Sequence, residues 1–191
     1  MTKKIKKIAV LGLGKVGELV ATLAHESGFI VTGVDSVKRE KTPFKVTTGN
    51  VSDNEFLKKL FEKNDAVISC LPYFLNKDVM KVAHENNIHY FDLTEDVSTT
   101  NYAKKLSATS QSVTAPQCGL APGFIAIVGS SLARNFKRVR NIELRVGALP
   151  QHPKGELGYA INWSAEGVVN EYLNDCEIIS EGKVKIVPAM Q

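Results

Sequence analysis

The hydrophobic pattern of the first 35 residues predicts a strand, a tight turn, a helix and a second strand. An apolar run over 8–11 is typical of a strand buried on both faces, and apolar residues then recur at helical spacing over 16–23. A second apolar run over 29–34 ends at Asp35, 18 residues after the last glycine of the turn. This order and length are those of a dinucleotide-binding βαβ unit.

Three glycines of the turn have separable roles in such a unit. Gly12 permits the sharp turn, Gly14 lacks the Cβ that would block a pyrophosphate, and Gly17 lets the helix pack close to the strand. The amides and the positive dipole end of the helix then face the phosphates. Glycine-rich turns also occur for structural reasons alone, but the strand before and the helix and acid after favour nucleotide binding.

Asp35 indicates which cofactor binds. A carboxylate at this position accepts hydrogen bonds from the two ribose hydroxyls of NAD and repels the extra phosphate of NADP. Lys38 and Arg39 follow three and four residues later and would neutralise a 2′-phosphate. The sequence therefore predicts NAD, with NADP as the alternative.

The next eighty residues repeat the alternation of strand and helix. Strands are predicted over 44–48, 65–71, 89–94 and 112–115, and helices around 56–61, 79–83 and 102–108, the first capped by Ser52 or Asp53. We therefore predict an α/β fold with a Rossmann doubly wound parallel sheet over 1–122.

The carboxyl ends of the predicted strands should form the ligand crevice. Asn50 and Val51 follow one strand and are placed beside the adenine. The loop LPYFLN at 71–76 would lie over the dinucleotide, where Tyr73 and Phe74 either pack against a helix or line the nicotinamide site. His89 opens its strand, about 17 Å from the reactive edge, which makes it a poor catalytic candidate.

Thr94, Glu95 and Asp96 emerge at the carboxyl end of the strand over 89–94. The two acids are therefore candidates for proton transfer with a substrate. Thr94 is equally suited to cap the next helix, with Asp96 near its positive dipole end.

The pattern changes after the loop PQCGLAPG at 116–123. It predicts an apolar helix over 124–132, strands over 142–147 and 158–164, a helix over 166–173 and a hairpin of 176–179 with 184–187. These pieces predict an incomplete, mixed α+β substrate or dimerisation domain over 123–191. Because its apolar faces would be exposed, we expect a homodimer or a companion chain that supplies the rest.

Composition excludes several other classes. The chain is 43% hydrophobic and 23% charged, and its net charge of +4 comes largely from lysines in the first seven residues, without aromatic residues between them for base stacking. It has no run long enough to span a membrane and no apolar signal segment. We expect a cytoplasmic protein with no nucleic-acid or membrane partner. Cys70, Cys118 and Cys176 lack metal-site or disulfide spacing, so we expect free thiols and no metal.

Several segments together resemble the saccharopine dehydrogenase family, including its lysine 6-dehydrogenase branch. They are GLGKVG with Asp35, ISCLPYFLN (68–76), HYFDLTEDV (89–97), CGLAPGF (118–124), VGALP (146–150) and LGYAINWSAEGVVNEY (157–172). The resemblance implies NAD(P)-linked oxidation at an amine-bearing carbon of an amino acid in lysine metabolism. Family members are longer chains, so the later strands of the substrate domain are expected to be missing here.

The resemblance also implies the site residues. The cofactor would be held by Gly12, Gly14, Lys15, Val16, Gly17, Asp35, Asn50, Val51, Leu71, Leu93 and Thr94. An acid is common in the family where Asn50 stands. The amino-acid substrate would be bordered by Gly119, Leu120, Asn162, Trp163 and Ser164, with Arg140 or Arg145 as a clamp for its carboxylates.

Two uses of this site remain open. In an enzyme, Asp96 or Glu95 would accept the proton that frees the substrate nitrogen lone pair before hydride transfer. The rival is a truncated, non-catalytic module that binds NAD(P) without turnover. The incomplete second domain favours the module, and the intact crevice loops favour the enzyme.

Overall fold

The computed structural model describes residues 4–147, 149–156, 158, 160 and 164–189. The chain divides into two compact units, 1–146 and 147–191. The predicted boundary after residue 122 remains a prediction. Within the described ranges, no helix combines the length and the apolar character needed to cross a membrane.

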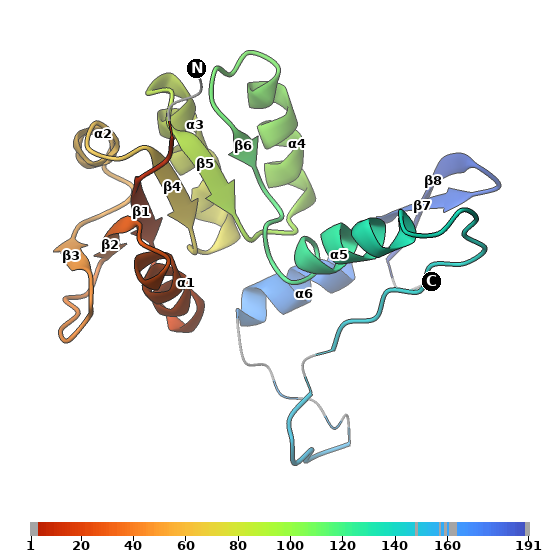
Figure 1. The fold of residues 1–191 in the computed structure, drawn as a ribbon. Helices are drawn as coiled ribbons and strands as arrows, with labels where there is room; N and C mark the ends of the chain where they lie inside the picture. Colours follow the sequence, from red (N-terminus) through yellow and green to blue (C-terminus); the bar gives the residue numbers. More distant parts are fainter. Residues whose placement is uncertain (1–3, 148, 157, 159, 161–163, 190–191) are drawn as a thin grey trace. The chain divides into compact units, whose positions relative to one another are not determined.

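The first unit is built on a parallel sheet of six strands in the order β3-β2-β1-β4-β5-β6 (Figure 1). Chain order reverses between β1 and β4, and the carboxyl ends of these two strands open the ligand crevice of a doubly wound fold. The predicted Rossmann sheet is thereby confirmed. The strands are β1 (Lys7–Leu11), β2 (Ile30–Asp35), β3 (Lys45–Thr48), β4 (Ala66–Ser69), β5 (His89–Asp92) and β6 (Thr114–Ala115).

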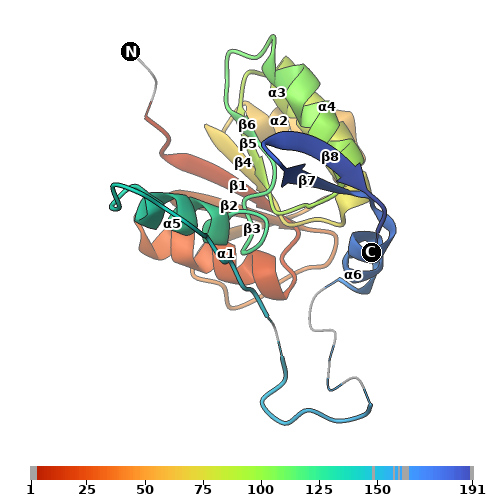
Figure 2. The same ribbon diagram turned by 90° about the vertical axis from the view of Figure 1, so that its right-hand side faces the viewer.

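Helices cover both faces of this sheet because its strands are apolar on both faces. Alternate residues of β1 point to opposite sides: Ala9 and Leu11 join one core cluster, and Ile8 and Val10 join the other. Figure 2 shows α1 on one face and α2, α3 and α4 on the other. Their bounds are α1 (Lys15–Glu26), α2 (Asn54–Phe61), α3 (Asn76–Glu85) and α4 (Val97–Ser107), with a short 3₁₀ turn, η1 (Tyr73–Leu75).

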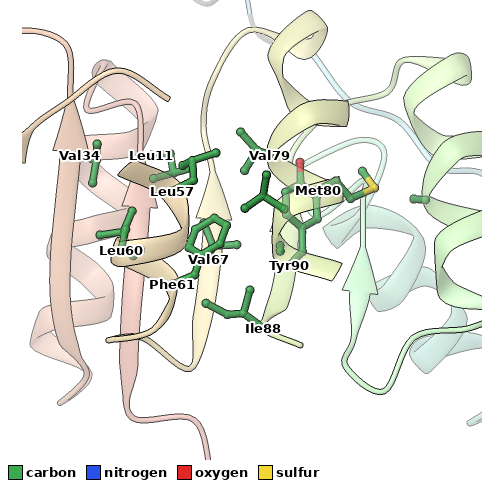
Figure 3. Packing of buried hydrophobic residues seen from close by; sticks show 14 residues of the cluster. Leu11, Val34, Leu57, Leu60, Phe61, Val67, Val79, Met80, Ile88 and Tyr90 are labelled. Atoms are coloured by element: carbon green, nitrogen blue, oxygen red, sulfur yellow. The ribbon is translucent and has the colours of Figure 1, made fainter. Parts of the chain in front are cut away.

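The larger core cluster lies under α2 and α3 (Figure 3). Leu57 of α2 and Met80 of α3 are fully buried among strand residues such as Val67. Each side chain of this size stabilises the fold by about 1.5–3 kcal/mol when it leaves water. Asp53 accepts hydrogen bonds from the Glu55 and Phe56 amides and thereby caps α2, as one of the two predicted caps.

The chain after β6 forms helix α5 (Phe124–Ala133), none of whose side chains, all of them described, is buried. The strand predicted over 142–147 is wrong, because the chain there is irregular and pairs with no described strand. An alternating apolar pattern needs a neighbouring strand to become a ladder. Instead, Leu144 lies against α5 at Gly129, where a Cβ would collide with it.

The second unit contains α6 (Ala165–Leu173) and the antiparallel hairpin of β7 (Cys176–Ser180) and β8 (Lys183–Val187). Ser164 caps α6 through a 3.0 Å bond from the Gly167 amide. Glu181 and Gly182 both have positive φ, which is the requirement of the two-residue hairpin turn. The predicted hairpin is confirmed, whereas the strand predicted over 158–164 falls largely on residues outside the described ones.

Candidate functional site

The glycine-rich turn between β1 and α1 lies at the carboxyl edge of the sheet. Gly12 has φ +83°, and a Cβ there would stand 3.0 Å from the Cys70 carbonyl oxygen. A Cβ at Gly17 would overlap the Gly12 carbonyl oxygen, so α1 can approach the strand only with glycine at this position. Conformation and packing inside the protein therefore explain these two glycines.

Gly14 has no such explanation in the described chain. Its backbone is extended, with φ −71°, and a Cβ there would meet nothing within 4 Å. Within the same described residues, no side chain caps α1, so the amides of its first turn, such as those of Lys15 and Val16, have no capping side chain. The turn therefore fits a pyrophosphate, which would approach the Gly14 backbone and accept those amides.

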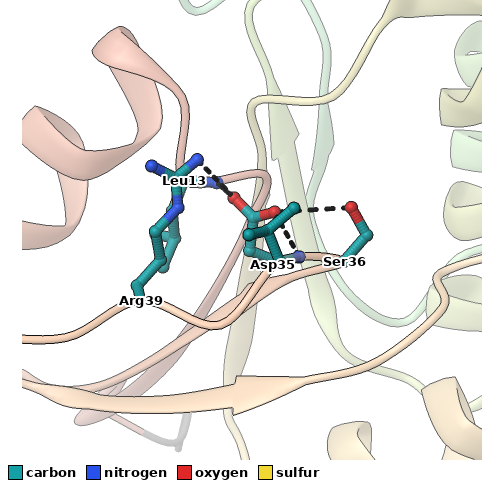
Figure 4. Close-up of polar contacts among 5 residues, drawn as sticks. Leu13, Asp35, Ser36 and Arg39 are labelled. Atoms are coloured by element: carbon teal, nitrogen blue, oxygen red, sulfur yellow. Dashed lines mark hydrogen bonds and ion pairs between the residues drawn. The ribbon is translucent and has the colours of Figure 1, made fainter.

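Asp35 ends β2 beside this turn (Figure 4). Its Oδ2 accepts the Leu13 amide at 3.0 Å, and its Oδ1 accepts the Val37 amide at 3.0 Å. The Arg39 guanidinium donates to Oδ2 at 3.2 Å. Burial opposes ionisation of Asp35, but the two amides and Arg39 outweigh it and lower the pKa of this carboxyl. The Asp35 side chain is 11% exposed and that of Arg39 is 39% exposed, so the cation is the more accessible partner.

The loop after β3 lies next to Asp35, because the Gly49 amide donates to the Asp35 carbonyl oxygen at 3.0 Å. Asn50 follows, and its Oδ1 accepts the Ser52 amide at 2.9 Å. Val51 packs against the larger core cluster. The structure thus brings the residues predicted for the adenine side to the same edge as Asp35.

The loops after β4, β5 and β6 form the other half of this edge. Leu71 borders the glycine turn, since a Cβ at Gly12 would stand 3.1 Å from its Cδ2. Gly119 borders the Leu93 carbonyl oxygen, 3.4 Å from where its Cβ would be. A predicted cofactor residue and a predicted substrate residue therefore meet here, and Leu120 beside them is exposed.

The predicted acids differ in their surroundings. Asp96 is buried and caps α4, since its Oδ2 accepts the Thr99 amide at 2.7 Å. Thr94 does not cap the helix itself; its hydroxyl accepts the Asp96 amide at 3.1 Å. Glu95 is half-buried, and no described residue hydrogen-bonds its carboxylate. Both catalytic assignments remain predictions, and the geometry leaves Glu95 freer for proton transfer.

Asp92 is a residue of this edge that the sequence analysis missed. It is fully buried at the end of β5 and accepts hydrogen bonds from the Tyr90 hydroxyl at 2.8 Å and the Thr94 amide at 3.0 Å. Burial raises the pKa of Asp92 despite these bonds. The signal in the sequence was a single acid inside an apolar strand, because a charge in such a place must be hydrogen-bonded.

The thiols at this edge are free. Burial is the main cause that raises the pKa of Cys70 to about 12, and it also raises the pKa of Cys118. Among the described side chains, no cluster of three or more His, Cys, Asp and Glu residues is arranged to hold a metal ion.

The remaining predicted substrate residues belong to other parts of the chain. Ser164 belongs to the second unit, where it caps α6. Arg145 is paired with Glu143 at 2.8 Å, and Arg140 lines a cavity of about 340 Å³ beside α5. Asn162 and Trp163 lie outside the described residues, so their substrate roles remain predictions.

Comparison with known proteins gives two family matches. The model of the saccharopine dehydrogenase NADP binding domain matches residues 8–118, and that of the saccharopine dehydrogenase C-terminal domain matches residues 119–191. Together they cover nearly the whole chain, and the first alone covers more than half of it.

Individual relatives agree with these matches. The chain is 27% identical over 195 residues to the mitochondrial alpha-aminoadipic semialdehyde synthase of Mus musculus, covering 94% of this chain and 21% of that protein. It is 24% identical over 202 residues to the saccharopine dehydrogenase [NADP(+), L-glutamate-forming] of Saccharomyces cerevisiae, covering 95% and 44%. The chain thus spans less than half the length of these two relatives.

A solved structure shares the fold. The apo saccharopine dehydrogenase (L-Glu forming) from Saccharomyces cerevisiae superposes with a TM-score of 0.64 at 22% identity, over 96% of this chain and 44% of that one. At this identity the likeness supports the fold alone.

Proposed function

The chain belongs to the saccharopine dehydrogenase family, and we propose that it is the cofactor-binding part of an NADP(H)-dependent oxidoreductase that acts on the CH–NH group of an amino acid. The observation that carries this proposal is Gly14. The space at its missing Cβ is open, and no described side chain caps the adjacent first turn of α1, as a diphosphate site requires.

We propose NADP rather than NAD, which revises the first expectation from the sequence. Both Asp35 oxygens already accept amides, from Leu13 and Val37, so the carboxylate has less capacity for ribose hydroxyls. Arg39 pairs with Asp35 and remains accessible, so it can bind a 2′-phosphate. The name of the matching cofactor-domain family, which specifies NADP, supports the same choice.

When bound, the nicotinamide accepts or gives the hydride, and the chain orients the reactants and moves protons. Oxidation of a carbon beside nitrogen requires a free nitrogen lone pair, so a carboxylate or an ordered water must accept a proton. Glu95 is suited to this role because its carboxylate is not engaged, whereas Asp96 holds the start of α4. Leu93 and Gly119 would border the two reactants.

The test is a titration of the purified chain with NADPH, followed by its fluorescence, together with an assay of NADP⁺ reduction in the presence of saccharopine or lysine. We expect NADPH to bind to the chain, and we expect the absorbance of newly formed NADPH to appear with one of these substrates. NADP⁺ would take the hydride and water would hydrolyse the resulting imine, so that saccharopine would yield an amino acid and a semialdehyde, whereas lysine would yield a semialdehyde and ammonia. Ammonia release would therefore favour the alternative reading as a lysine 6-dehydrogenase.

A non-catalytic module is the second candidate function. Its support is the short span of the chain relative to its relatives. NADPH binding without turnover, also in the presence of a companion chain, would favour this module over the enzyme. Absence of binding to either nicotinamide nucleotide would contradict both.

We also propose that the chain joins a second copy or a companion chain. Several large apolar side chains are more than half exposed, which is unusual on an isolated soluble surface. They are Phe124, Ile127 and Leu132 of α5, Val169, Tyr172 and Leu173 of α6, and Ile179, Val184 and Ile186 of the hairpin. Sedimentation velocity measures this directly, and a stable monomer at all concentrations would contradict it. The cytoplasmic location and the absence of nucleic-acid partners remain predictions.

A further inference from the structure

Four buried side chains form two hydrogen-bonded pairs at the carboxyl ends of β4 and β5. Ser69, Asn76, Tyr90 and Asp92 are each at most 1% exposed. The Ser69 hydroxyl donates to Asn76 Oδ1 at 2.7 Å, and the Tyr90 hydroxyl donates to Asp92 Oδ2 at 2.8 Å. The first pair joins β4 to the first residue of α3, and the second pair lies at the end of β5.

Asp92 also accepts hydrogen bonds from two loops. Its Oδ1 accepts the amides of Thr94, at 3.0 Å, and Gln117, at 3.4 Å, and its backbone carbonyl oxygen accepts the Cys118 amide at 2.8 Å. Thr94 lies in the loop after β5, and Gln117 and Cys118 lie in the loop after β6. A single side chain therefore joins two segments that are more than twenty residues apart in sequence.

The position of Asp92 is not explained by the needs of the core. The described buried polar side chains all lie at this end of the sheet, whereas the larger apolar cluster fills the space beneath it. Burial of a carboxylate is unfavourable even when it is hydrogen-bonded, and an apolar residue would fill the same place with a smaller desolvation free energy. The same burial raises the pKa of Asp92, which agrees with a charge placed there against its own solvation.

We propose that Asp92 is a positioning residue, which fixes the loop of Leu93 and Thr94 relative to the loop of Gln117 and Gly119. This inference rests on the proposed function, in which the first loop holds the nicotinamide half of the cofactor and the second borders the substrate. Asp92 would touch neither ligand. It acts through the Thr94 and Gln117 amides.

The first test needs no ligand. Amide hydrogen exchange at Thr94 and Gln117 should accelerate at least tenfold in Asp92→Ala, while amides in β1 and β2 keep their rates. Asp92→Asn is the conservative variant, because its Oδ1 can accept the same two amides and its Nδ2 can donate to the Tyr90 oxygen. It should keep exchange close to wild type. Unchanged exchange at both amides in Asp92→Ala would overturn the proposal.

The second test separates the two halves of the cofactor. NADPH and 2′,5′-ADP share the adenine half, but only NADPH reaches the loop after β5. Asp92→Ala should weaken the binding of NADPH about tenfold and leave the affinity for 2′,5′-ADP unchanged. Asp92→Asn should bind NADPH with the wild-type affinity. Equal loss for both probes, or no loss for either, would overturn the positioning role.

The two tests keep the inference distinct from the proposed function. If wild type binds neither probe, the proposed function fails, whereas the exchange experiment still reports on the loops. If Asp92→Ala does not fold, Tyr90→Phe replaces it, since it removes only the hydroxyl that donates to Oδ2. Tyr90→Phe should then accelerate exchange at Thr94 and Gln117 by a smaller factor, and identical exchange would overturn the proposal.

Discussion

The Asp35 carboxylate accepts the Leu13 amide at 3.0 Å and so joins the end of β2 to the glycine-rich turn. The acid is therefore part of the scaffold of the turn as well as a candidate ribose contact. Arg39 lies against the same oxygen, 3.2 Å away, and is the more accessible of the pair. Under the proposed function, we expect the choice between the two nicotinamide cofactors to depend on this cation.

Arg39→Ala should weaken the binding of NADPH about tenfold, because a charge-assisted contact to a phosphate contributes roughly 1.5–3 kcal/mol. The affinity for NADH, which lacks this phosphate, should stay within a factor of about two. Lys38→Ala is the matched control, since Lys38 is largely exposed and paired with Glu40 at 2.9 Å. Isothermal titration with both nucleotides measures the difference. Equal losses of NADPH affinity in the two variants would remove the assignment to Arg39.

The same substitution should have opposite effects at two glycines of the turn. Gly14→Ala should keep or slightly raise the melting temperature, because the added Cβ meets open space. The same variant should bind NADPH about tenfold or more weakly. Gly17→Ala should destabilise the fold by several kcal/mol, because its Cβ would overlap the Gly12 carbonyl oxygen. Thermal unfolding and nucleotide titration distinguish them. A Gly14→Ala chain that binds normally would contradict the pyrophosphate site.

Substitutions at the two acids separate helix capping from proton transfer. Asp96→Ala should lower stability by about 1 kcal/mol through loss of the Thr99 cap, and Asp96→Asn should retain most of it. Glu95→Gln should leave the unfolding free energy within about 0.5 kcal/mol, since surface changes away from specific contacts have small effects. In an assembly that turns over, Glu95→Gln should lower kcat more than Asp96→Asn. The reverse order would transfer the proton role to Asp96.

The carboxyls of Asp35 and Asp92 should give opposite slopes of stability against pH. The pKa of Asp35 is lowered, so its contribution is present above its unfolded value near 3.8 and is lost as pH falls through the folded value. The pKa of Asp92 is raised, so its contribution is complete below that unfolded value and is lost as pH rises through the folded value. Urea unfolding measures the free energy of unfolding across this pH range. In Asp35→Asn, this free energy should fall less steeply at acid pH than in wild type, and in Asp92→Asn its decrease on raising the pH should disappear. Variants with the same pH profile as wild type would contradict both pKa shifts.

The sequence was sufficient for the Rossmann sheet because its buried parallel strands are continuous apolar runs separated by helical spacing. The hairpin was also predictable, since Glu181 and Gly182 suit a two-residue turn. The alternating residues of 142–147 gave a wrong strand, because pairing depends on a neighbour that no local pattern can supply.

The site was predictable in its positions but not in its contacts. The spacing placed Asp35 and Arg39 four residues apart, yet it could not tell that their side chains would pair. It also placed Asp96 at a helix start and left capping and catalysis as equals, which only the Thr99 contact distinguishes in favour of a cap. Asp92 was missed because a strand pattern does not indicate which loop amides fold back to it.

The hydrogen bond between Tyr90 and Asp92 also constrains how this chain can diverge. Replacing either residue alone by an apolar one leaves the polar group of the other without its partner where water cannot reach it, at about 1–3 kcal/mol. Descendant sequences should therefore lose the Tyr90 hydroxyl and the Asp92 carboxylate together, while the apolar Leu71 varies among other hydrophobic types.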